Sequence, residues 1–142
     1  MKRPVKILIM GLPGSGKTYL AKRFSKIINA KWINADKIRG RYNDWDFTNE
    51  GIIRQVNRMK KIADTSRCKF VVADFVCPLH QQIKVFKPQI IVWMDTIKKS
   101  RYKSMNLIFK PPKKWNLRIK KKEIEINLIK LENKIKKYLK KK

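Results

Sequence analysis

The chain has 142 residues, of which 37 are lysine or arginine and 10 are aspartate or glutamate, so its formal net charge is +27. This length provides one domain with a hydrophobic core and leaves little room for a second domain. The charge favours an anionic partner, such as a nucleotide, a nucleic acid or an acidic surface. A lysine-rich composition alone would also produce it, so nucleic-acid binding stays an open alternative.

The sequence predicts neither a thiolate metal site nor a membrane segment. Cys68 and Cys77 form no CxxC pair, and the chain has one histidine, so zinc coordination by cysteine is not expected. Free thiols are typical of a reducing compartment. The apolar run Val5–Met10 contains Lys6 and is too short for a signal peptide or a membrane span. We therefore expect a cytoplasmic protein.

Hydrophobic patterning predicts strands that alternate with helices. The expected strands are Val5–Met10, Lys31–Asn34, Lys69–Val76, Gln89–Met94 and Trp115–Ile119. The expected helices are Thr18–Asn29, Asn49–Ser66, Leu79–Phe86 and one from Glu123 onward, with a loop at Tyr42–Thr48. This order predicts an α/β fold, a P-loop NTPase three-layer sandwich with a mostly parallel sheet of about five strands flanked by helices.

The expected organisation is one P-loop kinase domain over residues 1–120, with a short lid around residues 98–115. Residues 121–142 would form a basic amphipathic helix that is packed on the domain or appended to it. Its apolar residues recur at spacings of three and four, as on one face of a helix.

The strongest motif follows the first strand and matches G-x-x-x-x-G-K-[ST]. It comprises Gly11, Leu12, Pro13, Gly14, Ser15, Gly16, Lys17 and Thr18. In such a loop the backbone N–H groups surround phosphate oxygens at the start of a helix. Lys17 would reach the β- and γ-phosphate oxygens, and the Thr18 hydroxyl would bind Mg²⁺. We predict that the chain binds ATP with Mg²⁺.

Other candidates follow the remaining strands, because ligands in open α/β sheets bind at the carboxyl ends of the strands. Asp36 could orient an acceptor hydroxyl or hold a water of Mg²⁺, and we assign it catalytic and metal-binding roles; otherwise it would be a helix N-cap. Asp74 is a metal contact, a helix cap or a buried carboxylate with internal partners. Asp95 is interpreted mainly as a cap of the segment that follows it.

Arginines are the best candidates for binding a planar anion, since guanidinium pairs with phosphate in a bidentate manner. Arg39, Arg54 and Arg58 are therefore candidate anion contacts. Arg54, Asn57, Arg58 and Lys61 share one helical stripe, which could equally be a solvated charged face.

Residues 5–97 resemble the adenylylsulfate kinase family of P-loop kinases. The resemblance begins with the loop GLPGSGKT and continues with INADKIR (33–39), which is similar to that family's L-D-G-D-N-I-R. Phe47-Thr48 is similar to its G-F-S, and Arg54 and Asn57 are similar to its arginine and asparagine three positions apart. FVCP (75–78) is similar to F-I-S-P, and VWMDT (92–96) to F-V-D-T. It implies ATP-dependent phosphorylation of the 3′-hydroxyl of adenosine 5′-phosphosulfate, with Asp36 as the acidic residue of the catalytic loop. It also implies substrate contacts by Arg39, Phe47, Arg54 and Asn57.

The chain departs from that pattern at three places. Asn34 replaces an acidic residue, the spacing from Phe47 to Arg54 is longer by about two residues, and the lid is short, with Lys99, Arg101 and Lys103 as its candidate cations. We expect a small-molecule kinase acting on a small anionic or nucleotide substrate. The alternatives are a kinase of polynucleotides, nucleosides or sugar acids, and a non-catalytic ATP-binding module.

Overall fold

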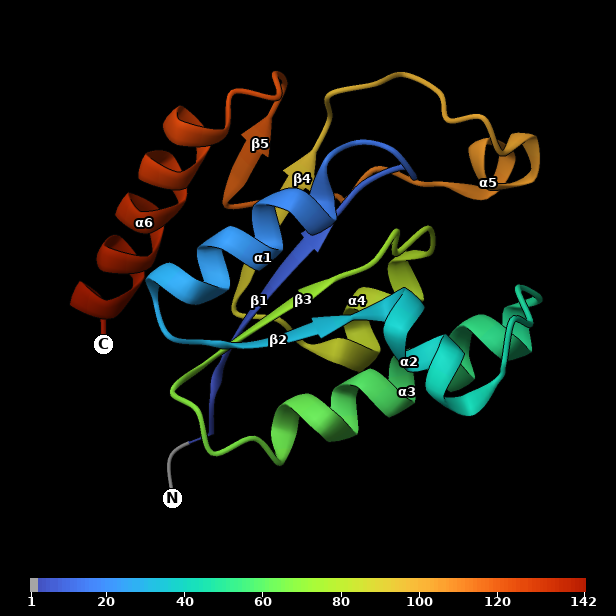
Figure 1. Ribbon diagram of the computed structural model, residues 1–142, viewed down its shortest axis with the longest axis horizontal. Coiled ribbons are helices and arrows are strands. Elements are labelled where there is room, and N and C mark those ends of the chain that lie inside the picture. Colours follow the sequence, from blue (N-terminus) through green and yellow to red (C-terminus); the bar gives the residue numbers. More distant parts are fainter. Residues whose placement is uncertain (1–2) are drawn as a thin grey trace.

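The computed structural model describes residues 3–142 and shows a central parallel sheet with helices on both faces (Figure 1). The strands are β1 (Val5–Met10), β2 (Lys31–Asn34), β3 (Phe70–Asp74), β4 (Ile90–Met94) and β5 (Leu117–Ile119). The helices are α1 (Lys17–Ile27), α2 (Ala35–Tyr42), α3 (Asn49–Asp64), α4 (His80–Phe86), α5 (Lys103–Ile108) and α6 (Ile124–Lys140). The strand order is β2-β3-β1-β4-β5, and all paired strands are parallel.

The sheet has apolar side chains on both faces because helices cover both. Alternate residues of a strand point to opposite faces, so Ile7 and Ile9 pack with α1 and α6, whereas Leu8 and Met10 pack with α3 and α4. Leu131 and Ile135 of α6 are buried in the apolar layer that contains Ile7 and Ile9. The basic C-terminal helix is thus packed on the domain, beside α1 (Figure 1).

The predicted fold class is confirmed, and every expected strand is present. Two helices were not expected as elements. Helix α2 begins where the Asn34 side chain accepts a hydrogen bond from the Lys37 N–H at 3.0 Å, which is an N-cap interaction. Helix α5 lies in the connection between β4 and β5 and has no buried residue.

No helix within residues 3–142 has the length and apolar character required to cross a membrane.

Candidate active site

A cavity of about 1120 Å³ lies at the carboxyl ends of the central strands. Its walls come from the loop after β1, the segments that follow β2 and β3, one side of α3, and residues 97–108. Among the strand ends singled out in the sequence, Asp36 and Asp74 line this cavity, whereas Asp95 does not. The crossover topology thus brings residues from five parts of the chain to one space.

The loop after β1 is held in a conformation that depends on its glycines. At Gly11, φ is 154°, and a Cβ atom would lie 2.6 Å from the Met94 carbonyl oxygen of β4. Gly16 has φ of 99° at the N-cap of α1, a value that side-chain-bearing residues rarely adopt. The Thr96 hydroxyl donates to the Ser15 carbonyl at 2.7 Å and fixes the loop from the other side. Gly14, Lys17 and Thr18 face the cavity at the start of the helix, as anion binding requires.

Lys17 is a buried cation at the wall of the cavity. Its ammonium donates to the Leu12 carbonyl at 3.0 Å, and its side chain is 8% exposed. Burial lowers the pKa of Lys17 from 10.5 to about 8, while the carboxylates of Asp74 and Asp36 act in the opposite direction. A buried cation with so few partners is stabilised when an anion enters.

The carboxylate beside Thr18 belongs to Asp74. Its Oδ1 accepts hydrogen bonds from the Thr18 hydroxyl at 2.9 Å and from Asn34 Nδ2 at 3.0 Å, and its Oδ2 accepts one from Trp32 Nε1 at 2.6 Å. Burial raises the pKa of Asp74, against the effect of these bonds and of Lys17. Hydroxyl and carboxylate oxygens are ligands that Mg²⁺ prefers. Thr18 and Asp74 therefore fit a magnesium ion, whereas the metal contact of Asp36 expected from the sequence stays a prediction.

Asp36 also lines the cavity, in the first turn of α2. Its carboxylate is exposed and makes no hydrogen bond or ion pair to a residue within 3–142. The alternative interpretation of Asp36 as the N-cap is wrong, because Asn34 takes that position. Asp36 is thus free to meet a ligand.

Arg39 and Phe47 form the second wall. The Arg39 guanidinium is 4.2 Å from the centre of the Phe47 ring and donates to the carbonyls of Asp44 and Asp46 at 2.9 and 3.2 Å. Arg39 is buried, whereas Phe47 is 52% exposed. Both line the cavity, so the structure brings these two predicted substrate contacts together.

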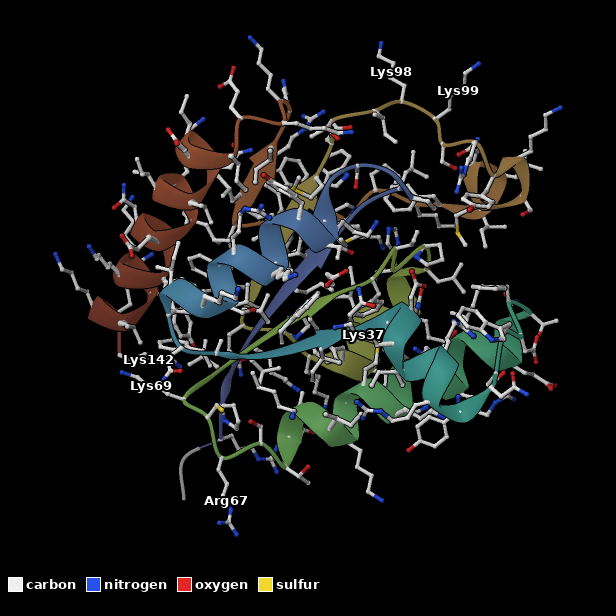
Figure 2. All side chains as sticks on the ribbon, in the orientation of Figure 1. Lys37, Arg67, Lys69, Lys98, Lys99 and Lys142 are labelled. Atoms are coloured by element: carbon white, nitrogen blue, oxygen red, sulfur yellow. The ribbon has the colours of Figure 1, made fainter. Side chains whose placement is uncertain are left out.

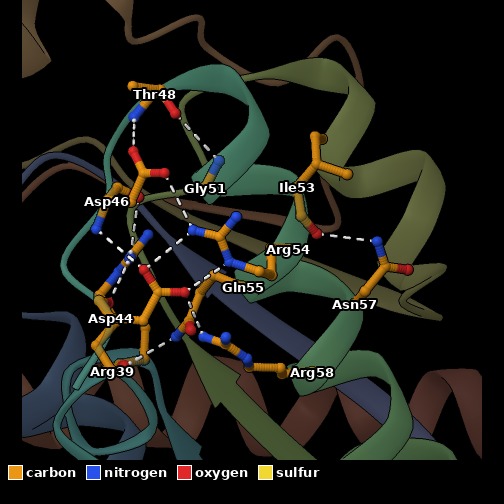
Figure 3. A network of polar contacts seen from close by, with 11 residues as sticks. Arg39, Asp44, Asp46, Thr48, Gly51, Ile53, Arg54, Gln55, Asn57 and Arg58 are labelled. Carbon is orange, nitrogen blue, oxygen red and sulfur yellow. Dashed lines mark hydrogen bonds and ion pairs between the residues drawn. The ribbon is translucent and has the colours of Figure 1, made fainter. Parts of the chain in front are cut away.

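The structure does not bring Arg54 and Asn57 to the cavity. Figure 3 shows the Arg54 guanidinium bonded to Asp44 at 2.7 Å and to Asp46 at 3.0 Å, and these bonds raise the pKa of Arg54. Asn57 donates to the Ile53 carbonyl of its own helix. Both line a separate hollow of about 620 Å³ together with Arg58 and Lys61. Contrary to the prediction, neither residue lines the cavity at the strand ends.

The side chains of α3 that face the cavity are Ile52 and Gln55. Each residue turns an α-helix by about 100°, so a shift of two positions moves a side chain to nearly the opposite side. Ile52 and Gln55 keep the spacing of three expected from the resemblance, two positions earlier than Arg54 and Asn57. Gln55 is 3% exposed and donates to the Ala35 carbonyl at 2.9 Å.

Two further predictions concerned Asp95 and the lid. Asp95 is not a cap: it accepts hydrogen bonds from the Arg118 side chain at 2.6 and 2.9 Å, and no helix begins immediately after it. Of the candidate lid cations, Lys99 and Arg101 line the cavity and Lys103 does not.

Sequence analysis missed Lys122. Its ammonium donates to the Gly14 carbonyl at 2.7 Å, across 108 positions of chain. It follows two other lysines in a basic run, so no local signal distinguishes it.

Comparisons with known proteins agree with this geometry. No protein-family model and no curated protein matches the sequence. Among solved structures, the APS kinase CysC of Mycobacterium tuberculosis in complex with AMPPNP and APS superposes with a TM-score of 0.80 and 16% identity, over 96% of this chain and 99% of that one. The chain has the fold of the adenylylsulfate kinases.

Other P-loop kinases share the architecture. A gluconokinase from Sinorhizobium meliloti matches with a TM-score of 0.67 and 14% identity over 99% of both chains. The shikimate kinase of Aquifex aeolicus matches with a TM-score of 0.62 and 11% identity, over 89% of this chain and 96% of that one. The resemblance read from the sequence is confirmed at the level of the fold.

Proposed function

We propose that the protein is an ATP- and Mg²⁺-dependent kinase that phosphorylates a hydroxyl group of a small anionic or nucleotide acceptor, as adenylylsulfate kinases do with a nucleotide 3′-hydroxyl. One observation carries the proposal: Lys17, Thr18, Asp74 and Asp36 line a single cavity. A phosphate donor at the glycine loop and an acceptor hydroxyl at Asp36 would meet there.

The donor side is formed by the glycine loop. Backbone N–H groups and the Lys17 ammonium would stabilise negative charge on the transferred phosphoryl group. The Thr18 hydroxyl and the Asp74 carboxylate would hold Mg²⁺, which neutralises charge on the phosphate oxygens when bound. Lys122, through Gly14, would restrain the outer part of the loop.

The acceptor side is formed by Asp36 and Arg39. Asp36 would orient the acceptor hydroxyl and accept its proton. Arg39, kept in place by two backbone carbonyls, would bind an anionic group of the acceptor. Lys99 and Arg101 also line the cavity, and closure of residues 97–108 would exclude water and suppress hydrolysis of ATP.

A coupled assay of ADP release tests the proposal. The acceptors are adenosine 5′-phosphosulfate, nucleosides, oligonucleotides and sugar acids, and Lys17→Ala is the inactive control. We expect acceptor-dependent ADP release, and Asp36→Asn should lower kcat by about 100-fold or more while changing the Kd of ATP little. Equal losses in both quantities would show that Asp36 is structural. ATP binding without ADP release for any acceptor would identify a non-catalytic module.

A further inference from the structure

We propose that the acceptor hydroxyl belongs to the end of a single-stranded nucleic acid whose neighbouring phosphates lie along residues 96–122. The inference rests on the proposed phosphoryl transfer and adds the class of acceptor. It is carried by an exposed basic segment that extends beyond the cavity and by aromatic side chains at the cavity wall.

Residues 96–122 contain eleven lysines and arginines and no aspartate or glutamate. All eleven are exposed, and Lys98 and Lys99 project outward from the connection after β4 (Figure 2). Within the described chain, Arg118 is the member of this set that pairs with a carboxylate, that of Asp95. The segment is therefore a continuous region of nearly uncompensated positive charge.

Two acidic residues elsewhere in the chain pair with cations outside residues 96–122. Asp44 pairs with Arg54 and Arg58, and Asp64 pairs with Lys6 and Lys60. These two carboxylates therefore do not offset the charge of residues 96–122, whereas Asp36 and Asp74 line the cavity itself.

Three of these cations do not line the cavity but are joined through the backbone to residues that do. Lys98 is adjacent to the lining residue Lys99, and Lys103 is adjacent to Tyr102. The Lys110 backbone N–H bonds to the carbonyl of Pro78, which also lines the cavity. We call Lys98, Lys103 and Lys110 the rim lysines. An acceptor contained within the cavity would not use them, whereas a polymer leaving it would pass them with one phosphate per nucleotide.

Exposed aromatic rings accompany the charge. Trp45 is 51% exposed, Phe47 52% and Tyr102 48%, and all three line the cavity. They come from two different segments, the loop after α2 and the connection after β4. Basic grooves combined with rings on which bases stack are the common means of binding single strands.

Helix α3 contributes no charged side chain to the cavity. Helix α3 presents Ile52 and Gln55 to it, while Arg54 and Arg58 are bonded to Asp44 outside. Arg39 is then the buried guanidinium on the acceptor side. Lys17, Lys99 and Arg101 also line the cavity, and the rim lysines would extend this positive charge to the neighbouring phosphates of a polymer.

The chemical step on a strand end is the same phosphoryl transfer as that proposed for a small acceptor. The terminal hydroxyl oxygen forms a bond to the γ-phosphorus as the bond from that phosphorus to the β–γ bridging oxygen breaks. The hydroxyl proton passes to the Asp36 carboxylate, and the nucleoside diphosphate leaves. The product is a phosphorylated strand end.

The test compares two triple variants that remove equal charge. The rim variant is Lys98→Gln, Lys103→Gln and Lys110→Gln. The control is Lys137→Gln, Lys140→Gln and Lys141→Gln, at the end of α6, which is the end of the molecule away from the cavity (Figure 1). Transfer of labelled phosphate from ATP is measured on 12-nucleotide DNA and RNA strands with free 5′- and 3′-hydroxyls, on adenosine 5′-phosphosulfate and on gluconate, over a range of salt concentrations.

We expect phosphorylation of at least one strand type, with kcat/KM falling steeply as salt rises. Each phosphate contact on a single strand contributes about 0.7 to the slope of log affinity against log salt, so the rim variant should have a slope shallower by about 2 (0.7 × 3). Its kcat/KM on the strand at low salt should fall by about tenfold or more, whereas the control should stay within about twofold of the unaltered protein. The KM of ATP should be the same in all three.

Three results would overturn the inference. Transfer to a small acceptor but not to either strand would refute it and leave the proposed kinase function intact. Equal losses in the rim variant and the control would show that net charge, and not this surface, is responsible. No transfer to any acceptor would refute the proposed function as well.

Discussion

The role of Asp74 can be separated from its structural contribution by replacing it with asparagine. Asp74 is 2% exposed, and it is hydrogen-bonded to Thr18 and Asn34 through one oxygen and to Trp32 through the other. Asp74→Asn keeps the shape but turns one acceptor into a donor, which must then face another donor. A hydrogen bond to a charged group contributes about 1.5–3 kcal/mol.

The net loss of stability should be smaller than the sum of these bonds. Burial raises the pKa of Asp74, which means that the folded state already bears a cost for its charge, and asparagine removes that cost. We expect the free energy of unfolding of the ATP-free protein to fall by about 1–3 kcal/mol. Activity should fall much further, by about 100-fold in kcat/KM, because a magnesium ligand beside Thr18 is lost.

Trp32→Phe is the matched control. It removes the hydrogen bond to the far oxygen of Asp74 and leaves the oxygen that meets Thr18. Urea unfolding and steady-state kinetics at saturating Mg²⁺ should show similar losses of stability in the two variants. Activity should fall within about tenfold for Trp32→Phe. If both variants lost activity only in proportion to stability, Asp74 would be a structural anchor and the magnesium assignment would be refuted.

Three further predictions concern charged side chains. Burial lowers the pKa of Lys17 to about 8, and phosphate binds the protonated form of this lysine. The Kd of ATP, measured by calorimetry, should therefore rise above pH 8 by up to about tenfold per pH unit. Lys17→Ala should bind ATP weakly and show no such rise. Partial burial acts to raise the pKa of Asp64, but hydrogen bonds from two lysines lower it overall; its stabilisation is therefore present above the ordinary carboxyl pKa and lost as pH falls through the lowered one. Asp64→Asn should reduce stability at pH 7 by about 1–3 kcal/mol in urea unfolding, with little difference from the unaltered protein near pH 2. Arg39→Ala should raise the KM of the acceptor about tenfold or more, whereas Arg54→Ala should leave this KM within about twofold. A larger increase in KM for Arg54→Ala than for Arg39→Ala would show that Arg54 binds the acceptor.

The strands and the phosphate loop could be predicted because their signals are local. A strand covered on both faces is a short apolar run, as in Val71, Val72 and Ala73, and the glycine loop interrupts such a run at Gly11. Helices α2 and α5 give no comparable signal. Helix α2 has two buried residues, Ile38 and Arg39, and one of them is charged; α5 has none. With so few buried apolar residues, periodicity does not indicate a helix.

The partnership of Thr18 with Asp74 could not be read from the sequence, since it depends on which strands are neighbours. Strand β3 lies beside β1 in a register that places Asp74 opposite Ile9, and the glycine loop begins two residues later. The sequence left Asp74 open among a metal contact, a helix cap and a buried carboxylate with internal partners. The structure shows the partners, and the metal contact stays a prediction.

Helix α3 shows how two kinds of sequence information can conflict. Motif spacing pointed to Arg54 and Asn57, yet the apolar residues Ile52, Val56, Met59 and Ala63, all buried, define the inner side of the helix. Arg54 lies about 200° around the axis from Ile52, so the helix cannot bury this stripe and also turn Arg54 toward the cavity. Burial of four apolar side chains outweighs the exposed ion pairs of Arg54 by several kcal/mol. The orientation of α3 is therefore set by its core contacts, and we propose that Arg39, the aromatic wall and the basic rim recognise the acceptor instead.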